Sequence, residues 1–454
     1  MTLFPKSQGI LPNPFLKTYQ SIAYESLLRL AWGLGFLVRP FSKKINLMYR
    51  GRQSLIPRLQ TAVQGWERPI WFHVASSGEL EQCLPIADEM KRRWPQQKIL
   101  ITYFSATAQK AITLEKERRK KANVPYSWDF ADFAPFDFKK EVTAFVQIVR
   151  PLALVMIHRE VWPNLVNVCQ DHQIACFLFA THFSEKTIRA WGWYQNSLQK
   201  LQWIGTTDSD SAKHLSHWLG VGRYENVGPR IEVIGDSRID RVLVRKQWQP
   251  KPVWEDFFQQ RPTWIAASLW PKDFKALKKS LQFVLNEHPQ WRLVLVPHEP
   301  NDSFVNDISQ WFKTQKNAVR LWSHWSRQPD DHSHLIVNAV GFLAELYRIS
   351  HLTFVGGSFH KKVHNVLEPA AYGNPILCGP HIQNAREALD LQGKGLVSAE
   401  TDDLLLREVK RLLTHPKEQE AAASATLQYF TSRLGASRRY CDVLEKNIPQ
   451  LSRH

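Results

Sequence analysis

The sequence is poor in cysteine and lacks several common functional signatures. Its five cysteines are an odd number and include no CxxC pair, which disfavours a disulfide framework and a structural zinc site. No GxGxxG or GxxxxGK[ST] motif occurs, which argues against dinucleotide dehydrogenases and P-loop ATPases. Internal repeats, low-complexity tracts and an arginine-rich tail are also missing. We therefore expect a globular protein of a reducing compartment.

Acidic residues are scarce relative to basic ones. The chain has 59 Lys and Arg against 42 Asp and Glu, a formal net charge of +17. This balance indicates an anionic partner, and the lack of zinc-finger or RNA-binding signatures favours an anionic membrane surface or a phosphorylated substrate over nucleic acid. The alternative is that the charge serves solubility alone. A length of 454 residues predicts two domains.

The N-terminal region contains one long apolar stretch, residues 21–38. It lacks the basic start and small-residue end of a cleaved signal peptide. A full membrane span would place Glu25 and Arg29 in the bilayer, which costs free energy. We predict a membrane-associated helix that lies at the interface, within residues 1–48. The alternative is a helix packed against the rest of the protein.

Short apolar runs alternate with helical patterns from Arg68 onward. This alternation predicts two α/β domains with parallel sheets, at residues 49–240 and 263–417. Prolines in residues 241–262 indicate a linker. Two such domains suggest a cleft, with ligands at the carboxyl ends of strands. The predicted strands are Ile70–Val74, Ile99–Phe104, Leu152–Ile157, Ile174–Ala180, Trp203–Gly205, Ile231–Gly235, Trp264–Ala267, Leu293–Val296, Leu335–Val337, Leu352–Val355, Pro375–Cys378 and Gly395–Val397.

Three polar motifs follow strands of the first domain. Ser76–Ser77–Gly78–Glu79 places a carboxylate after a strand and a glycine turn, where it could accept a proton from a hydroxyl group. The alternative is a glutamate that only stabilises the start of a helix. Glu160 precedes Trp162–Pro163, a helix start, and is weak evidence by itself. Arg238, in Gly235–Asp240, could neutralise a phosphate or form a structural ion pair.

The second domain carries a glycine turn between a strand and a helix. Gly356, Gly357 and Ser358 supply N–H and O–H donors for an anion, as in nucleotide sites. His364 and Asn365 follow, with Asn365 expected to cap a helix over residues 365–372, and Glu368 could bind a ribose diol. Two further motifs follow strands, namely SLWPKD (Ser268–Asp273) and Pro297–His298–Glu299. Taken alone, each of these two motifs is typical of a surface turn.

Together these motifs resemble those of the 3-deoxy-D-manno-octulosonic acid (Kdo) transferases of lipopolysaccharide synthesis. The resemblance covers roughly Tyr19 to Leu413, in order and spacing as well as content. It is carried by HVASSGE, TYFSATA, EVWPN, GDSRID, SLWPKD, PHE and FVGGSFHKKVHNVLEPAAYGNPILCGP. It implies a GT-B fold of two Rossmann-like domains, with a last helix, residues 418–454, that returns to the N-terminal domain. It also implies the donor CMP-Kdo, a lipid A precursor as acceptor, and the cytoplasmic face of the bacterial inner membrane.

The resemblance further implies roles for individual residues. Glu79 would be the general base of an inverting transfer that needs no metal ion or cofactor, with Glu160 as a second acid near the cleft. Ser76, Ser77 and Gly78 would contact the acceptor. Donor binding would fall to Arg238, Ser268, Pro297, His298, Glu299, Gly356, Gly357, Ser358, His364, Asn365 and Glu368.

The chain departs from the family pattern at several of these motifs. His158 replaces a common glutamate, Asn338 an aspartate, and Lys361 and Lys362 a glycine-bearing loop. SLWPKD and PHE replace Ser-Thr-His and Pro-Arg-His types of run. Two other functions stay open: a GT-B enzyme that uses another nucleotide sugar on a lipid or cell-wall acceptor, and a non-catalytic protein that binds lipid surfaces.

Overall fold

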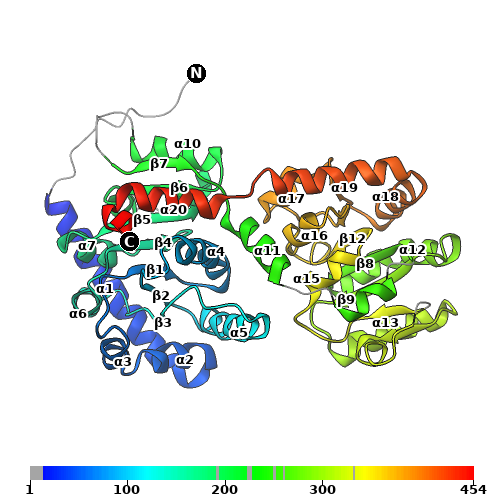
Figure 1. Cartoon of the computed structure of the whole chain (residues 1–454), viewed down its shortest axis with the longest axis horizontal. Helices are drawn as coiled ribbons and strands as arrows, with labels where there is room; N and C mark the ends of the chain where they lie inside the picture. The colour runs from blue at the N-terminus through cyan, green and yellow to red at the C-terminus, as the bar shows by residue number, and fades with distance from the viewer. Residues whose placement is uncertain are drawn as a thin grey trace. The chain divides into compact units, whose positions relative to one another are not determined.

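The chain folds into two compact units, each built on its own parallel sheet. The computed structural model describes residues 14–190, 194–221, 228–248, 252–258, 261–330 and 333–453. Unit 1 comprises residues up to Arg238 together with Gly435–His454, and unit 2 comprises Ile239–Leu434 (Figure 1). The predicted architecture of two doubly wound α/β units is therefore confirmed.

Unit 1 contains seven parallel strands in the order β3-β2-β1-β4-β5-β6-β7. Its strands are β1 (Ile70–Val74), β2 (Ile99–Tyr103), β3 (Phe130–Phe133), β4 (Ala153–Ile157), β5 (Ala175–Thr181), β6 (Trp203–Thr206) and β7 (Arg230–Val233). Its helices include α1 (Pro14–Val38), α2 (Lys43–Arg52), α3 (Leu55–Ala62), α4 (Ser77–Arg93), α5 (Ala106–Ala122), α6 (Lys139–Val149), α7 (Pro163–Asp171), α8 (Glu185–Ala190), α9 (Gln195–Leu198), α10 (Ser209–Leu219) and α20 (Ala436–Asn447).

Helices cover both faces of this sheet, because its central strands are apolar on both sides. Alternate residues of β1 illustrate this: Phe72 packs with α4, α5 and α20, whereas Trp71 packs with α3, α6, α7 and α10. Both side chains are fully buried. The C-terminal helix α20 packs on α4 and brings Tyr440 into this core, where its hydroxyl accepts a hydrogen bond from the backbone N of Ala180 at 2.8 Å.

Unit 2 contains seven parallel strands in the order β10-β11-β9-β8-β12-β13-β14. Its strands are β8 (Thr263–Leu269), β9 (Arg292–Pro297), β10 (Val319–Leu321), β11 (His334–Ile336), β12 (Leu352–Val355), β13 (Ile376–Cys378) and β14 (Leu396–Ser398). Its helices include α12 (Pro271–Glu287), α13 (Asp302–Thr314), α14 (Trp322–Trp325), α15 (Leu343–Leu346), α16 (Leu367–Ala371), α17 (Arg386–Leu391), α18 (Asp402–Thr414) and α19 (Pro416–Thr431).

The structure corrects three sequence-based expectations about element boundaries. The predicted linker, residues 241–262, is helical over much of its described length, with α11 (Ser237–Trp248) and a 3-10 helix, Val253–Phe258. The predicted C-terminal helix is two helices, and only residues from Gly435 onward belong to unit 1. Gly435 has φ +88°, a conformation that suits glycine and separates α19 from α20.

The helix predicted over residues 365–372 begins later and is shorter. It is α16, Leu367–Ala371, and its first flanking residue, Val366, makes no side-chain cap. The Asn365 side chain instead accepts a hydrogen bond from the backbone N of Leu367 at 3.0 Å, within the turn that precedes the helix. Two short edge strands, β3 and β10, were not predicted because neither forms a long apolar run.

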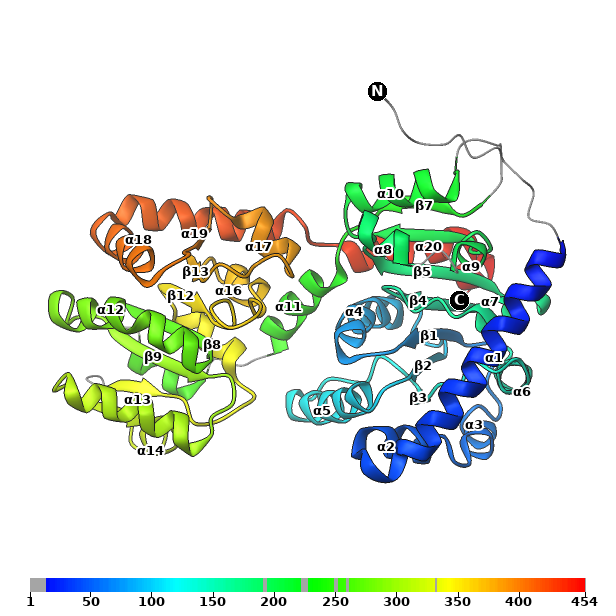
Figure 2. The same ribbon diagram turned by 180° about the vertical axis from the view of Figure 1, so that it is seen from behind.

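The predicted N-terminal helix exists as α1, Pro14–Val38. Within the described part of the chain, no helix combines the length and the apolar character needed to cross a membrane. One face of α1 is held to unit 1, and the course of the helix is visible in Figure 2. The hydroxyl of Tyr24 donates to the Asp137 carboxylate at 2.8 Å, and the Asn164 amide donates to Glu25 at 3.4 Å. The alternative of a packed helix therefore holds for this face.

The opposite face of α1 is an apolar surface exposed to solvent. We call it the α1 stripe, and it continues past the helix into the short turn and α2. The exposed fractions of Leu30, Leu37 and Phe41 are 61%, 68% and 89%. The other members of the stripe are Leu27, Leu34, Val38 and Leu47.

Candidate functional site

Several of the sequence motifs fall near one place in each unit, the point where the strand order reverses. In unit 1 this point lies between β1 and β4, and in unit 2 it lies between β8 and β12. Glu79, Glu160 and Gly356 follow β1, β4 and β12, and Ser268 lies near the end of β8. Open parallel α/β sheets bind ligands at this position, because the loops diverge to either face and leave a crevice.

Glu79 lies in the first turn of α4 and is 9% exposed. Its carboxylate accepts hydrogen bonds from the backbone N atoms of Ala75, at 2.5 Å, and Ser76, at 2.9 Å. The Ser76 side chain caps the helix in return, which completes a capping box. The helix-stabilising role that the sequence left as an alternative is therefore present.

The beginning of α4 is open toward solvent in front of Glu79. Ser77 and Gly78 are both exposed. A Cβ atom built on Gly78 would have only the Ser76 hydroxyl within 4 Å, at 3.9 Å. Packing of the protein therefore does not require a glycine at position 78, and its small size leaves space at the helix start.

Glu160 lies in the loop after β4 and forms a carboxyl pair with Glu79. Burial, followed by the charge of Glu79 and a smaller contribution from a side-chain hydrogen bond with Glu79, raises the pKa of Glu160 to about 7. Burial also raises the pKa of Glu79, against the backbone hydrogen bonds and the charge of Arg159, which lower it. Trp162 donates from Nε1 to Glu160 Oε2 at 3.0 Å. The pair therefore shares a proton near neutral pH.

The backbone hydrogen bonds determine which member of the pair is ionised. Two N–H groups point at the carboxylate of Glu79 and favour its charged form. Glu160 receives only the indole N–H of Trp162 among the donors found in the described residues. The charged form is therefore favoured more strongly at Glu79 than at Glu160.

Basic residues beside this pair are engaged with neighbours inside unit 1. Arg159 donates from Nε to His158 Nε2 at 3.2 Å, and burial and Arg159 lower the pKa of His158 to about 4. The guanidinium of Arg238 binds the Asp236 carboxylate at 2.8 and 2.5 Å. The structural ion pair that the sequence left open for Arg238 is therefore present.

The glycine turn of unit 2 binds an anion, but that anion is a side chain of the protein. The backbone N of Gly357 donates to Asp273 at 2.8 Å, and that of Phe359 does so at 3.0 Å. The backbone N of Gly356 donates to Ala267 O at 2.8 Å. The Gly356 and Gly357 amides, which the sequence predicts to serve a phosphate, therefore both have partners within unit 2.

Ser358 and the two glycines shape the turn. The buried Ser358 hydroxyl donates to Val355 O at 3.2 Å and accepts from the backbone N of Gly379 at 2.7 Å. A Cβ atom at Gly356 would lie 2.4 Å from Ser268 O, so only glycine allows the ends of β12 and β8 to approach this closely. The role of Ser358 in the structure is therefore to join β12 to the loop after β13.

The remaining predicted donor residues surround this turn. Pro297 is buried at the end of β9, and His298 and Glu299 follow it and are exposed. Asn365 is exposed in front of α16, and Glu368 is half-buried in its first turn. Ser268 is half-buried with φ +54° at the end of β8.

Sequence reasoning missed two side chains of this region, Asp273 and Trp270. Asp273 is fully buried and also accepts from the backbone N of Trp270 at 2.9 Å, so it anchors three amides. Its sequence position three residues after Trp270, with Pro271 between them, is a helix-start signal that could have identified it. Trp270 stacks with His298 and His360 at ring-centroid distances of 4.9 and 5.0 Å.

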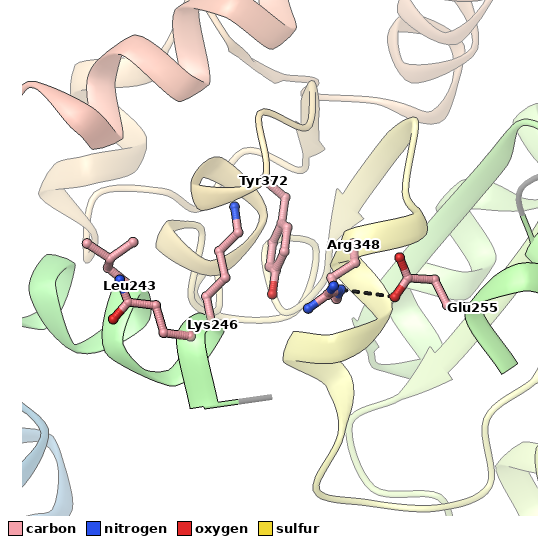
Figure 3. A pocket seen from close by; sticks show the side chains of 6 residues that line it. Leu243, Lys246, Glu255, Arg348 and Tyr372 are labelled. Carbon is pink, nitrogen blue, oxygen red and sulfur yellow. Dashed lines mark ion pairs between the residues drawn. The ribbon is translucent and has the colours of Figure 1, made fainter. Parts of the chain in front are cut away.

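A separate open pocket of about 450 Å³ lies in unit 2 beside α11 and α16 (Figure 3). The ammonium group of Lys246 lies 4.3 Å from the centre of the Tyr372 ring and donates to Ala371 O at 3.0 Å. Arg348 pairs with Glu255 at 3.1 Å. The pocket was not predicted, and both of its cations have partners. No cluster of His, Cys, Asp or Glu side chains suited to a metal ion occurs among the described residues.

Comparison with known proteins supports one family. Residues 48–241 match the family model described as 3-deoxy-D-manno-octulosonic-acid transferase (kdotransferase). The chain is 27% identical over 402 residues to the 3-deoxy-D-manno-octulosonic acid transferase of Haemophilus influenzae, covering 85% of this chain and 88% of that protein. It is 24% identical over 388 residues to the enzyme of that name from Bordetella pertussis, covering 83% and 87%.

Solved structures show the same fold at low sequence identity. A UDP-GlcNAc 2-epimerase from Neisseria meningitidis covers 83% of this chain and 100% of its own, with a TM-score of 0.59 and 14% identity. A glycosyltransferase from Rickettsia africae covers 84% and 98%, with a TM-score of 0.52 and 11% identity. The fold is of the GT-B type, and over most of its length the chain is similar to the 3-deoxy-D-manno-octulosonic acid transferases, a family of glycosyltransferases.

Proposed function

We propose that this protein transfers Kdo from CMP-Kdo to a lipid A precursor, with inversion at the anomeric carbon and with Glu79 as general base. The observation that carries this proposal is the Glu79–Glu160 carboxyl pair at the strand-order reversal of unit 1. Similarity to the 3-deoxy-D-manno-octulosonic acid transferases supports the donor and the reaction class. A base must be ionised at the working pH, and the backbone hydrogen bonds of Glu79 favour that form against the effect of burial.

The proposed reaction is a single displacement. The acceptor hydroxyl oxygen forms a bond to the anomeric carbon while the bond from that carbon to the CMP phosphate oxygen breaks. The hydroxyl proton passes to the carboxylate of Glu79, and CMP leaves with the bonding electron pair. Glu160 is protonated and hydrogen-bonded to Glu79, so it restrains the base without competing for the same proton.

Donor binding is assigned to the turn before α16. The backbone N–H groups of Gly357 and Phe359 already donate to Asp273, so we assign the contacts with the nucleotide to side chains. Lys361, Lys362 and Asn365 are exposed there, and the two lysines supply positive charge for the phosphate. We assign Glu368 to the ribose hydroxyls, because a carboxylate can accept hydrogen bonds from both members of a diol.

The α1 stripe is assigned to the anionic surface of a bilayer. Leu27, Leu30, Leu34 and Leu37 recur at spacings of three and four residues, so they share one face of the helix. Lys43 and Lys44 follow directly and are exposed. An exposed apolar face beside basic residues is typical of helices that lie in a membrane interface. The proposed location is the cytoplasmic face of the bacterial inner membrane, where a lipid acceptor is at hand.

The transfer proposal is tested with purified protein, CMP-Kdo and a lipid A precursor, with the product identified by mass. We expect Glu79→Gln to lower the rate by about 10²- to 10⁴-fold, the usual contribution of a general base. Glu117→Gln, at an exposed glutamate of α5, is the matched control and should retain the activity. Binding of CMP to the Glu79→Gln protein should be unchanged. Near-normal turnover by this variant would refute the assignment of Glu79, and binding of UDP in place of CMP would favour a different nucleotide sugar.

The membrane proposal is tested by flotation with vesicles that contain anionic lipid. Replacing Leu30 or Leu37 with Glu should weaken binding by about 10- to 150-fold, the equivalent of one leucine no longer buried. Val340→Glu is the matched control, because Val340 is 75% exposed in unit 2. Equal flotation of all these variants would show that the stripe does not contact lipid.

A further inference from the structure

Four aromatic rings gather at the carboxyl end of the sheet of unit 2. Trp270, after β8, stacks with His298 and with His360 at interplanar angles of 27° and 20°. His298, after β9, also stacks on His364 with ring centroids 4.3 Å apart. The rings therefore connect three loops of the predicted donor region. Neither the motif comparison nor the proposed reaction explains the role of Trp270.

A hydrogen bond fixes the chemical state of one ring in this cluster. Trp270 Nε1 lies 3.1 Å from His364 Nε2. An indole N–H can only donate, so His364 Nε2 must be an acceptor and carry no proton. His364 is then the neutral tautomer with its single proton on Nδ1, an assignment that follows from the hydrogen-bond network.

The packing of Gly357 determines which edge of this imidazole is turned away. A Cβ atom on Gly357 would lie 2.7 Å from Cδ2 and 2.9 Å from Nε2 of His364. The edge with Cδ2 and Nε2 therefore rests on the glycine turn, and the edge with Nδ1 points away from it. Among the residues that the structure describes, no hydrogen bond to Nδ1 is found, so its N–H is available to a ligand.

The charges around His364 keep the ring neutral. Burial lowers its pKa to about 4, and His298 and Lys362 act in the same direction. The other titratable groups of the cluster are His360, stacked on Trp270, and Asp273, whose carboxylate lies below the turn and interacts with His360. Protonation of two stacked imidazoles 4.3 Å apart would be unfavourable, which also preserves a neutral His364.

We propose that Trp270 is a positioning residue that fixes His364 as the Nδ1–H tautomer, so that this N–H donates a hydrogen bond to a phosphate oxygen of the nucleotide donor. The proposal rests on the proposed function for the identity of the nucleotide. A neutral donor of fixed orientation binds the anion without a dependence on pH between about 5 and 9, the range in which a free histidine would lose its charge. The Nδ1–H group of His364 also takes the place of the backbone N–H of Gly357 as a phosphate donor, because that N–H donates to Asp273.

The first test needs no ligand and measures the tautomer by NMR of the full chain labelled with ¹⁵N-histidine at pH 7.5. The His364 signals are assigned by their loss in His364→Gln. We expect the Nδ1–H pattern in the natural protein and a mixture of tautomers in Trp270→Phe, which retains an aromatic ring but lacks the N–H donor. His360→Gln removes a ring that stacks on Trp270 and should leave the tautomer unchanged. An Nε2–H pattern in the natural protein, or an unchanged pattern in Trp270→Phe, would overturn the proposal.

The second test measures the affinity for CMP by calorimetry at pH 6 and pH 8.5. Loss of one hydrogen bond to a charged group weakens binding by about 10- to 150-fold, the result expected for His364→Phe at pH 8.5. Trp270→Phe should weaken CMP binding by a smaller factor at pH 8.5 and recover part of it at pH 6, where an imidazole freed from the indole gains a proton. If the natural protein fails to bind CMP, the proposed function fails while the tautomer result stands. If CMP binds equally well to all three proteins, the phosphate contact is refuted.

Discussion

Glu79 in unit 1 and Asp273 in unit 2 occupy the same position in the chain relative to their helices, yet they end in different environments. Each is the third residue of the helix that follows the first strand of its sheet, and each accepts a hydrogen bond from the backbone N atom of the residue that caps the helix. The difference is supplied by the neighbouring loop. The loop after β4 brings a second carboxyl group to Glu79, whereas the loop after β12 brings two N–H donors to Asp273.

One local motif thus lies in two different electrostatic environments. Three backbone donors leave Asp273 with its charge satisfied by the protein, so it stabilises the turn. A second carboxyl group leaves Glu79 in a site that holds one proton between two acids, a property useful for proton transfer. The environment of a carboxylate at such a helix start therefore depends on which groups the loop after the neighbouring strand brings to it.

The largest expected effect comes from removing the carboxylate of unit 2. Asp273→Ala leaves three backbone N–H groups without an acceptor, and each buried unsatisfied group costs about 1–3 kcal/mol. We expect the free energy of unfolding of unit 2 to fall by roughly 3 kcal/mol or more, and binding of CMP to be lost with the shape of the turn. Chemical denaturation followed by tryptophan fluorescence and CMP calorimetry check the two results.

Asp302→Ala is the matched control for this variant. Asp302 also lies in the first turn of a helix of unit 2, but it is exposed and should be replaceable at little cost. Tighter binding of CMP by Asp273→Ala, with stability unchanged, would show that the amides of Gly357 and Phe359 are the phosphate site after all. In that case the helix start of unit 2, like that of unit 1, would lie in a site that contacts a substrate.

The environment of Asp273 shows where prediction from sequence stops. Apolar runs located most strands, because buried parallel strands are continuous apolar segments, and the glycine turn after β12 was recognised as an anion site. The identity of the anion could not be predicted, since it depends on a residue 84 positions away in sequence. The SLWPKD motif drew attention to the exposed Lys272, whereas its buried Asp273 makes the contacts.

The carboxyl pair of unit 1 was only partly accessible to prediction. Both Glu79 and Glu160 were named as candidates, because each follows a strand and precedes a helix. Their hydrogen bond depends on β1 and β4 being neighbours in the sheet, which alternation of strands and helices does not specify. Edge strands such as β3 were missed for a related reason, because their residues are only partly buried and carry a weaker apolar signal.

A smaller effect is expected from Glu160→Gln, which tests which member of the Glu79–Glu160 pair acts as the base. The amide can donate a hydrogen bond to Glu79 as a protonated carboxyl group does, so turnover should fall by less than about tenfold, well below the 10²- to 10⁴-fold range for loss of a general base. The amide has no proton to lose, so any inflection of the pH–rate profile near pH 7 that belongs to Glu160 should disappear in this variant. Glu160→Gln as inactive as Glu79→Gln would make Glu160 the base.

A third buried carboxylate, Asp137, extends the comparison within unit 1. It accepts hydrogen bonds from Tyr24, Asn164 and Leu165 at 2.8, 3.0 and 2.8 Å, and so resembles Asp273 more than Glu79. These bonds join α1 to the start of α7, three residues beyond Glu160. Burial outweighs them, however, and raises the pKa of Asp137 to about 7. Asp137 should therefore report on stability as a function of pH.

The smallest expected effect is a change in how steeply stability depends on pH, and the sign of that change follows from proton binding. The folded state holds a proton on Asp137 up to about pH 7, whereas the unfolded chain releases it near pH 4. This group therefore contributes most stability at the acidic end of that window and loses it as the pH rises from about 4 to 7. In Asp137→Asn the contribution is absent, so thermal unfolding between pH 5 and 8 should show a smaller fall in Tm than in the natural protein. Tyr24→Phe removes a hydrogen bond that lowers the pKa and should make the fall steeper. Parallel slopes in all three proteins would mean that the three donors keep Asp137 ionised throughout, as the backbone amides do for Glu79.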